Sequence, residues 1–305
     1  MENQRLIPVI LGATGVGKSE IAFELARRYS WEIVSVDSRQ CYQFMEIGTA
    51  KPNAEMRSLV SHYLLDLCPP DYKLSAGEFA RHAWELFLSL ERPLAVGGAG
   101  FYMKAIFEPL HANLPHNPLI REELETLPTA TLARKLKAED QVTSEKLHPN
   151  DRQRLLRALE VCLAARRPYS ELIKETPPSP PVKPFYIGLR LDRNELRKRQ
   201  EHRLERMLNE GFVNEVRRLK EMGFSRDLYA FNAYGYKELF DYLDGLTTLD
   251  DAKGLILSKI HSFTKRQETF FKTLGEIKWI DAFDFNNTQE AVRLLIEKQL
   301  HAYFI

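Results

Sequence analysis

The sequence predicts an α/β fold, an open parallel sheet flanked by helices and interrupted by an all-helical insertion. Over the first hundred residues, short apolar runs alternate with amphipathic helical patterns, which is typical of a parallel sheet. Two of these runs lead directly into glycines, where the carboxyl ends of parallel strands bind ligands. Between two proline-rich stretches, residues from about 110 to 184 have helical patterns and no convincing strand, which favours an insertion.

Composition restricts the class of protein. The 305 residues are 44% hydrophobic and 28% charged, and the net charge of +1 means that any basic footprint must be local. The three cysteines are far apart, so neither a disulfide framework nor a zinc site follows, and a reducing compartment is expected. The N-terminal apolar run is too short for a signal peptide, and no stretch approaches the roughly 20 apolar residues of a membrane span. We expect a cytoplasmic protein.

The first strand and helix enclose a phosphate-binding motif. The strand "LIPVIL" (residues 6–11) precedes the helix "KSEIAFELARRYS", and between them the pattern GxxxxGK[ST] is complete. Backbone N–H groups of such a loop surround phosphate oxygens at the positive end of a helix. The lysine contacts the outer phosphates and the serine hydroxyl can bind Mg²⁺. The diphosphate-binding candidates are Gly12, Ala13, Thr14, Gly15, Val16, Gly17, Lys18 and Ser19.

This loop makes the fold P-loop NTPase-like but does not name a reaction, because kinases, NTPases and other transferases share it. The second strand, "WEIVSVDS" (residues 31–38), ends in an acid, Asp37. A carboxylate there suits a general base beside the phosphates, and equally a helix N-cap or an outer ligand of Mg²⁺. Arg39 and Gln40 suit recognition of a base or phosphate, or are plain surface residues.

The remaining core elements follow in order. Residues 75–90 form a helix with a capping box of Ser75 and Glu78, and residues 92–100 form a buried strand that runs into glycines. Residues 185–191 return to the sheet as a strand, the chain is then helical to about residue 275, and "IKWIDAF" is a short terminal strand. The catalytic core therefore comprises residues 1–110 and 185–305, and the helical insertion comprises residues 111–184.

Two helices carry basic or polar faces. In "HPNDRQRLLRALEVCLAA", Asn150 is the expected N-cap, and Gln153, Arg157 and Glu160 share one face that is either solvated or contacts a ligand. Its apolar stripe consists of Leu155, Leu156, Leu159 and Cys162. Residues 190–220 contain ten Lys or Arg and six Asp or Glu, a local charge of +4. Arg199, Arg203 and Arg206 form a stripe there, which indicates either a salt-bridged helix or phosphate contacts.

Together these residues resemble the tRNA dimethylallyltransferase (tRNA isopentenyltransferase) family. The motifs that carry the resemblance run in family order over nearly the whole chain: "GATGVGKS", "VDSRQCYQFMEIGTAKP", "HYLLDLCPPDYKLSAGEF", "AVGGAGFY", "HPNDRQRLLRALEV", "NAYGYKEL" and "KRQETFF". The glycine loop alone is generic. The "DSRQ" and "IGTAKP" stretches followed by "HPND" and "QRLLRALE" are highly specific.

The resemblance implies prenyl transfer. The loop would hold the pyrophosphate of dimethylallyl diphosphate with Mg²⁺, and Ser19 would contact the metal. N6 of the adenine 3′-adjacent to the anticodon would attack the allylic carbon, with Lys18 stabilising charge on the leaving pyrophosphate. Asp37 would accept the N6 proton. Arg203, a catalytic candidate with Asp37 and Lys18, would clamp the pyrophosphate together with Arg199.

The resemblance also implies a tRNA partner for a nearly neutral chain. The adenine would leave its stack to reach the base. The insertion would grip the anticodon stem, and the protein would act as a monomer with no membrane contact. The residues expected to face tRNA are Asp37, Ser38, Arg39, Gln40, Ala99, Gln153, Arg154, Leu155, Leu156 and Arg157.

This chain departs from the family pattern at three places. The family usually has threonine where Ala99 stands, so this chain lacks the hydroxyl that the resemblance implies would contact tRNA. It also tends to read "TRQ" where this chain has Ile260, His261 and Ser262, so a cation and an amide are lost. Ser19 replaces a commoner threonine conservatively.

Three alternatives stay open at the level of sequence. An ATP-dependent kinase explains the loop and Asp37, but not the helical insertion or the "DSRQ" run. A relative that prenylates free adenine nucleotides needs no large RNA-gripping insertion. A P-loop protein that binds without turnover is the third. ADP release, transfer to AMP and turnover itself distinguish them.

Overall fold

A computed structural model describes residues 4–109, 114–175, 177 and 179–301. By its internal contacts the chain divides into two compact units, residues 1–108 with 180–305 and residues 109–179. The predicted boundary at residues 110 and 111 lies outside the described residues. The elements in chain order are β1 (Arg5–Gly12), α1 (Lys18–Tyr29), β2 (Glu32–Val36), α2 (Ala54–Leu59), β3 (His62–Tyr63), α3 (Ala76–Ser89), β4 (Pro93–Gly97), α4 (Gly100–Phe107), α5 (Pro118–Glu125), α6 (Thr129–Glu139), α7 (Gln141–Lys146), α8 (Arg152–Ala165), α9 (Tyr169–Leu172), β5 (Val182–Arg190), α10 (Arg193–Asn209), α11 (Phe212–Glu221), the 3₁₀ helix η1 (Tyr229–Asn232), α12 (Tyr236–Leu243), α13 (Leu249–Phe271), β6 (Ile277–Asp281) and α14 (Phe285–Gln299).

The larger unit is built on one six-stranded sheet in the order β3-β2-β4-β1-β5-β6. Every pair in it is parallel. The predicted P-loop NTPase-like open parallel sheet is therefore confirmed. Because the chain leaves β1 toward β2 on one side and returns later to β5 on the other, the carboxyl end of β1 lies where the strand order reverses.

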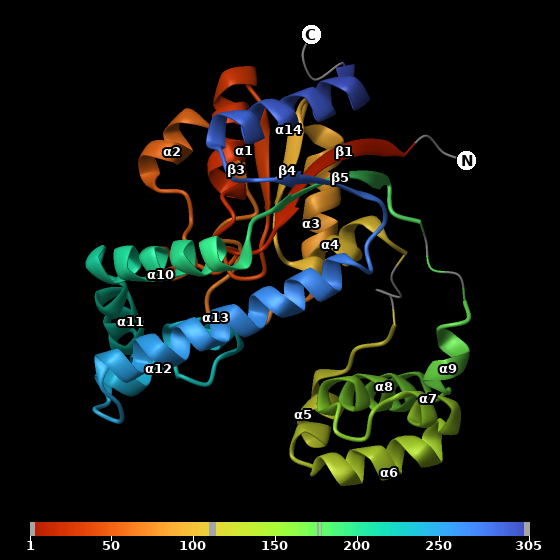
Figure 1. The fold of residues 1–305 in the computed structure, drawn as a ribbon. Coiled ribbons are helices and arrows are strands. Elements are labelled where there is room, and N and C mark those ends of the chain that lie inside the picture. The colour runs from red at the N-terminus through yellow and green to blue at the C-terminus, as the bar shows by residue number, and fades with distance from the viewer. Residues whose placement is uncertain (1–3, 110–113, 176, 178, 302–305) are drawn as a thin grey trace. The chain divides into compact units, whose positions relative to one another are not determined.

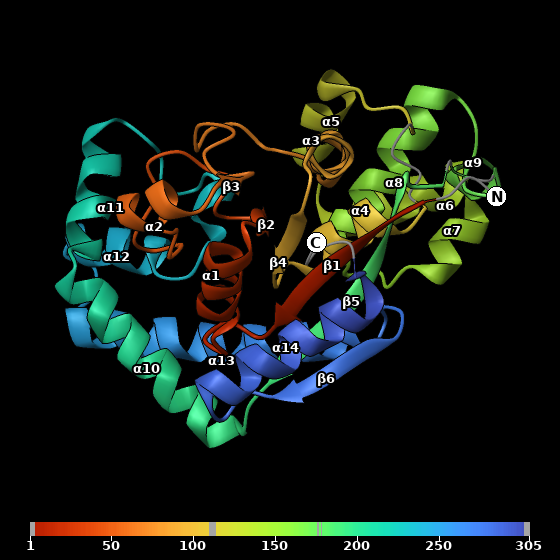
Figure 2. The same ribbon diagram turned by 90° about the horizontal axis from the view of Figure 1, so that it is seen from above.

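Helices cover both faces of this sheet (Figures 1 and 2). On one face, α1 and α14 pack together over the strands, and α3 and α4 form a pair on the other. The core between α1, α14 and the sheet includes fully buried aliphatic side chains such as Ile10, Leu25 and Val292. A further layer is made by α10, α11, α12 and α13, which pack on one another in sequence.

Local sequence explains the helix boundaries. α1 begins after Gly17, whose φ of +100° is a conformation that favours glycine. The capping box predicted for α3 is confirmed, because the Ser75 hydroxyl accepts from the Glu78 N–H and the Glu78 carboxylate accepts from the Ser75 N–H. α14 begins at an Asp284 cap that accepts from the N–H of Asn287.

Two strands and one helix differ from the sequence prediction. The two-residue strand β3 was not predicted, because an isolated pair of residues leaves no alternating pattern. The strand β5 begins at Val182 rather than residue 185, within the proline-rich stretch, where Pro184 lies opposite Ile7. The terminal strand is followed by α14, which the prediction omitted.

The smaller unit contains helices only, from α5 to α9, among its described residues. A core of leucines holds α5, α6 and α8 together, including Leu124, Leu132 and Leu159. The N-cap of α8 is Asp151, whose carboxylate accepts from the N–H of Arg154, so the predicted cap at Asn150 was wrong by one residue.

Two further observations concern the chain as a whole. Among the described helices, none is both long enough and apolar enough to cross a membrane. The three cysteines Cys41, Cys68 and Cys162 are free and buried.

Candidate active site

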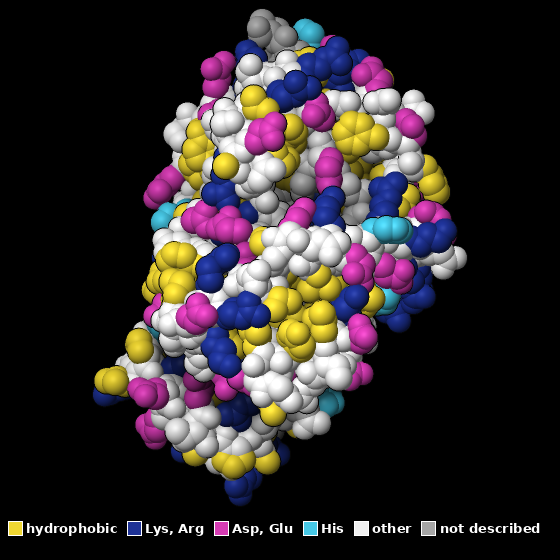
Figure 3. Space-filling view, turned by 90° about the vertical axis from the view of Figure 1, so that its left-hand side faces the viewer, with side chains coloured by type: hydrophobic (Ala, Val, Ile, Leu, Met, Phe, Trp, Pro, Cys, Tyr) yellow, Lys and Arg dark blue, Asp and Glu magenta, His cyan; other side chains and the backbone are white. Residues whose placement is uncertain are grey.

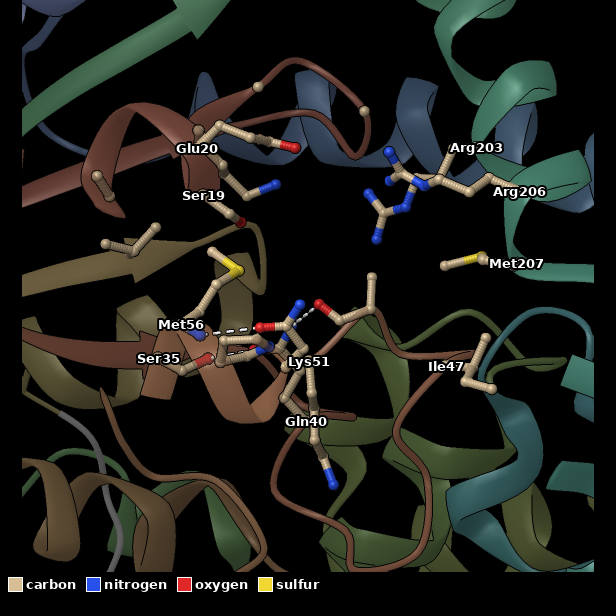
Figure 4. A pocket seen from close by; sticks show the side chains of 18 of the residues that line it. Ser19, Glu20, Ser35, Gln40, Ile47, Lys51, Met56, Arg203, Arg206 and Met207 are labelled. Atoms are coloured by element: carbon tan, nitrogen blue, oxygen red, sulfur yellow. Dashed lines mark hydrogen bonds between the residues drawn. The ribbon is translucent and has the colours of Figure 1, made fainter. Parts of the chain in front are cut away.

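A cavity of about 1160 Å³ opens beside the phosphate loop in the larger unit. It is lined by the start of α1, by β2, by the segment from residue 40 to α2, and by α10, with Phe283 and Phe285 at one side. Figure 4 shows Ser19 and Glu20 on one wall, Lys51 and Met56 on another, and Arg203 and Arg206 projecting from α10. On the side of the molecule that carries α2, α10 and α11, basic and acidic side chains are interspersed (Figure 3).

The phosphate loop has the conformation that its glycines permit. It joins β1 to α1, and Gly15 has a φ of +87°, a region that L side chains rarely adopt. A Cβ at Gly15 would also lie 3.0 Å from Gln200 Cγ, a tight approach that adds to the conformational preference for glycine. Lys18 and Ser19 are the first residues of α1, at the end of the helix that attracts anions.

Two glutamines from distant helices brace this loop. Gln200 of α10 donates to the Thr14 carbonyl at 2.8 Å and to the Thr264 hydroxyl at 3.0 Å. Gln267 of α13 accepts from the Thr14 N–H at 3.1 Å and donates to the Gly98 carbonyl at 2.9 Å. Both side chains are at most 5% exposed. Sequence reasoning assigned them no role, although Gln267 stands in the quoted "KRQETFF" motif.

Cations from the loop and from α10 converge on the cavity. The Arg203 guanidinium donates to the Thr14 hydroxyl at 3.4 Å, and Arg199 donates to the Val16 and Ala282 carbonyls at 3.4 Å. The predicted stripe of Arg199, Arg203 and Arg206 thus lines the cavity together with Lys18. Both Lys18 and Arg203 lie beside the loop that would hold the diphosphate.

Their electrostatics indicate a site prepared for an anion. Burial, and then the charge of Arg203, lower the pKa of Lys18 to about 8, against weaker opposing effects of Asp37 and Glu20. Burial likewise lowers the pKa of Arg203, which Glu20 and Asp37 oppose. A polyanion bound between these two cations would relieve their repulsion.

Asp37 follows the carboxyl end of β2. Its Oδ1 accepts from the N–H of Arg39 at 2.7 Å and from the N–H of Gln40 at 3.4 Å, which closes a turn. The structure records no hydrogen bond to Oδ2 from the described residues. Asp37 does not line the cavity, but its charge reaches Lys18 and Arg203 beside the phosphate loop and also reaches Tyr234. Its carboxylate is therefore close enough to act electrostatically on the cations of the loop and on this aromatic residue.

Two of the other residues in the "DSRQ" run, Arg39 and Gln40, form hydrogen bonds within the protein. Arg39 donates to the carbonyls of Tyr229 at 2.8 Å and Ala230 at 3.4 Å. Gln40 accepts from the Ser35 hydroxyl and donates to the carbonyls of residues 49 and 50, so its amide is used in structure rather than presented to RNA. Ser38 is half-buried, and its tRNA contact stays a prediction.

The segment from residue 46 to 51 is held by buried charge, which the sequence did not reveal. The Glu215 carboxylate accepts from the N–H groups of Glu46, Ile47 and Gly48 at 2.7–3.1 Å. The Lys51 ammonium, inaccessible to solvent, pairs with Glu46 and Asp66. These contacts shape the cavity wall, because Glu46, Ile47 and Lys51 line it.

Ala99 caps α4 with no side-chain hydrogen bond, so the hydroxyl that the family pattern supplies has no replacement at this cap. At the other departure, His261 is half-buried, and its Nε2 has no hydrogen-bond partner among the described residues.

In the smaller unit, the predicted tRNA residues on α8 separate into two groups. Gln153 and Arg154 are exposed. Arg157 donates to the carbonyls of residues 114 and 115 and lies 3.3 Å from the buried carboxylate of Glu160. Leu155 and Leu156 are each 1% exposed in the core of the unit, so the prediction that they contact tRNA is corrected for their side chains. The same two residues fulfil their predicted place in the apolar stripe.

The residues at the loop are compatible with a magnesium ion held largely by phosphate. No cluster of three or more His, Cys, Asp or Glu suited to a metal occurs within the described part of the chain. Mg²⁺ in phosphate sites commonly uses one or two protein oxygens, phosphate oxygens and water. The exposed Ser19 hydroxyl, next to Glu20 on the cavity wall, supplies such an oxygen.

A phosphate loop at the switch point of a parallel sheet, with converging cations and a nearby carboxylate, defines a P-loop protein equipped for transfer from a phosphorylated ligand. The family model described as IPP transferase matches residues 40–274. The chain belongs to the IPP transferase family, as the resemblance predicted.

Individual relatives agree with this assignment. The chain is 38% identical over 292 residues to tRNA dimethylallyltransferase 2 of Geotalea uraniireducens, covering 92% of this chain and 93% of the relative. It is 40% identical to the tRNA dimethylallyltransferase of Rippkaea orientalis, covering 91% and 93%.

Solved structures agree as well. The tRNA isopentenylpyrophosphate transferase of Bacillus halodurans aligns with a TM-score of 0.71 at 31% identity, over 99% of this chain and 98% of that one. The Staphylococcus epidermidis enzyme gives 0.70 at 30% identity, over 97% and 100%. A eukaryotic dimethylallyltransferase acting on tRNA shares the fold at a TM-score of 0.81 and 22% identity, over 97% of this chain and 79% of that one.

Proposed function

We propose that this protein transfers a dimethylallyl group from dimethylallyl diphosphate to N6 of the adenine 3′-adjacent to the anticodon in tRNA, releasing pyrophosphate. The observation that carries the mechanism is the place of Asp37, directly after the carboxyl end of β2 and within electrostatic reach of Lys18 and Arg203. A carboxylate near the donor site but outside the cavity lining suits a base that acts on the acceptor.

The loop and α10 would bind the donor's diphosphate. Backbone N–H groups of the loop, the start of α1, Lys18 and Arg203 surround one end of the cavity. Arg199, beside Val16, adds a third cation. As the allylic C–O bond breaks, these groups stabilise the charge that develops on the departing pyrophosphate. Gln200 and Gln267 contribute by holding the loop in the shape that points its donors inward.

Asp37 would act on the acceptor. As N6 forms its bond to the allylic carbon, the N6 proton moves to the carboxylate, so the product is a neutral secondary amine. The hydrogen bonds from the N–H groups of Arg39 and Gln40 hold Oδ1 in place. The target adenine must leave its stack to reach this carboxylate, as bases do in other enzymes that modify them.

Mg²⁺ would neutralise diphosphate charge, with the Ser19 hydroxyl as its protein ligand. The helical unit would bind the anticodon stem, with Gln153, Arg154 and Arg157 on α8 as candidate contacts. We expect a monomer that works where tRNA is found, in the cytoplasm.

The direct test is a transfer assay with radiolabelled dimethylallyl diphosphate, Mg²⁺ and bulk tRNA lacking the modification. Label entering the RNA supports the proposal, and the Asp37→Asn variant under the same conditions should incorporate label at least about 100-fold more slowly. Label entering AMP but not tRNA would contradict the proposed acceptor. No transfer to either, combined with substrate-dependent ADP release from ATP, would replace the proposal by a kinase.

A further inference from the structure

Tyr229 presents a half-exposed aromatic ring close to two cations. It is the first residue of η1, and the whole residue is 40% exposed. The Arg39 guanidinium carbon lies 4.8 Å from the centroid of its ring, and the Lys73 ammonium lies 5.5 Å from it. Cations at these distances are attracted to the face of an aromatic ring.

The backbone beneath this ring is fixed. Arg39 donates hydrogen bonds to the carbonyls of Tyr229 and Ala230, at 2.8 and 3.4 Å. The next residues along η1, Ala230 and Phe231, are completely buried, and the Phe231 ring stacks on Tyr236 at 5.7 Å. Tyr229 is therefore presented from an anchored turn, which reduces the entropy that a ligand would lose in ordering it.

The ring is continuous with the acceptor side of the proposed base. Arg39 links the two, because its N–H donates to Asp37 while its guanidinium contacts Tyr229. Tyr234 lies within electrostatic reach of Asp37, Arg39 and Arg266. The Tyr234 ring also packs on Phe263 at 5.1 Å. We call the set of Arg39, Lys73, Tyr229, Tyr234, Phe263 and Arg266 the cation–aromatic face.

We propose that Tyr229 stacks on an unpaired base of the anticodon loop beside the target adenine, while Lys73 binds a neighbouring phosphate. The inference rests on the proposed function, since it names the acceptor contacts of the same site. Every nucleobase has a π-face, and single-stranded RNA is bound by aromatic rings among cations that attract its phosphates. A loop whose target adenine has been extruded leaves its neighbours without a stacking partner. The exposed ring of Tyr229, which Arg39 connects to Asp37, supplies one.

The cation–aromatic face has both features that bind single-stranded RNA, rings that stack on bases and cations that attract phosphates. Its aromatic rings are partly exposed, and its three basic side chains, Arg39, Lys73 and Arg266, match the charge of the RNA backbone. Arg39 is already committed to the η1 carbonyls, so its part is to position Tyr229 rather than to read the RNA. Lys73 is exposed and forms no ion pair among the described residues, which leaves its ammonium available to a phosphate.

The test measures binding of a fluorescent anticodon stem-loop RNA to the full chain, together with binding of pyrophosphate. Alanine substitution of a base-stacking ring typically costs about 1–3 kcal/mol, so Tyr229→Ala should weaken RNA binding about 5- to 150-fold. Pyrophosphate affinity should stay unchanged. Tyr229→Phe keeps the ring and should bind RNA within about twofold of the natural protein. Lys73→Ala should reduce the salt dependence of log K by about one phosphate contact.

A second comparison identifies the stacked base. RNAs with an abasic nucleotide on the 5′ or the 3′ side of the target adenine should bind the natural protein more weakly at one of these positions. At that position Tyr229→Ala should add little further loss, because ring and base contribute to the same contact. Trp279→Ala is the matched control. Trp279 is also 40% exposed, but it lies on β6, with three strands between β6 and β2.

The outcomes separate the two proposals. If the natural protein transfers no label to tRNA, the proposed function fails whatever Tyr229 does. If transfer occurs but Tyr229→Ala binds RNA normally, or shows no coupling to either neighbouring base, the inference alone is overturned. Loss of RNA and pyrophosphate binding together would also overturn it, because that pattern indicates a disturbed site rather than a lost stack.

Discussion

The backbone N–H of Arg39 donates a 2.7 Å hydrogen bond to the Asp37 carboxylate, while the Arg39 side chain extends away from it to Tyr229. One residue thus positions the proposed base and the proposed RNA platform together. A shift of Arg39 would move both. Asp37 has two roles here: it accepts a hydrogen bond that closes the turn, and it is the proposed proton acceptor. A substitution that keeps the first role and removes the second can test them separately.

Replacing Asp37 by asparagine keeps the oxygen that accepts from Arg39 but removes the base. We expect kcat to fall about 100- to 10,000-fold, the usual contribution of a general base, with donor affinity within about twofold of the natural value. Single-turnover transfer to tRNA and a separate binding measurement with dimethylallyl diphosphate would check this. An equal loss of donor affinity would instead point to a role of Asp37 in metal binding.

Arg203 and Arg206 form a matched pair on α10. Both line the cavity, but Arg203 contacts the phosphate loop at Thr14, whereas Arg206 pairs with Glu210 near the solvent. Arg203→Ala should weaken the binding of pyrophosphate and of dimethylallyl diphosphate to a similar extent, about tenfold or more, as expected for a lost charged hydrogen bond. Arg206→Ala should change either affinity less than threefold. Calorimetry measures both affinities. Equal affinities of the two variants, or no effect of Arg203→Ala, would contradict a role of Arg203 in diphosphate binding.

The lowered pKa of Lys18 predicts a pH-dependent donor site. With a pKa of about 8, Lys18 in the free protein loses its charge as the pH rises through 8, and a bound polyanion raises that pKa again. Binding above pH 8 must therefore take up a proton, so pyrophosphate affinity should fall by up to about tenfold per pH unit.

A variant separates this effect from titration of the ligand itself. Lys18→Arg carries a cation that stays protonated, so its affinity should fall less steeply between pH 7.5 and 9.5. Titrations with pyrophosphate and Mg²⁺ at each pH give both slopes. Identical slopes for the two proteins would show that Lys18 remains charged throughout and contradict the prediction.

Glu215 should contribute more to the free energy of unfolding than exposed glutamates on the same helix. Its carboxylate, 1% exposed, accepts from three backbone N–H groups and from the Tyr236 hydroxyl at 2.7 Å. Glu215→Gln places an amide donor against these donors and should lower the free energy of unfolding by about 2–5 kcal/mol. Urea unfolding measures this free energy. Glu221→Gln, on the exposed face of α11, is the control, and its free energy of unfolding should stay within about 0.5 kcal/mol of that of the natural protein. Equal stability of the two variants would refute the role assigned to the buried carboxylate.

Much of the fold was predictable because its signals are local. Apolar runs ending in glycine identified β1 and β4, and a Ser75 cap identified the start of α3. The strand β3 and the early start of β5 were not predictable, because the sequence of these residues has no strand pattern. They are strands because they pair across the sheet, β3 with Ile33 of β2 and the start of β5 with Ile7 of β1. Tertiary pairing decided those boundaries.

The site was predictable to the extent that its motifs are contiguous. The loop from Gly12 to Ser19 and the acid Asp37 are adjacent in sequence to strand ends, and topology brings such ends together. The braces Gln200 and Gln267 and the clamp Glu215 were not found, because a polar residue on a helix gives no sign of which buried partner it will meet. For the same reason the "QRLLR" run of α8 was assigned to tRNA as a block, although helical periodicity turns its two leucines into the core.

The brace on Thr14 spans most of the chain. Gln267 contacts a residue 253 positions earlier, and Gln200 contacts the same residue from 186 positions away. During synthesis the phosphate loop leaves the ribosome before either glutamine exists. The loop therefore lacks both braces until residue 267 has emerged and α13 has docked. We expect donor binding to be acquired late in translation, so chains terminated before residue 267 should compete poorly for the diphosphate.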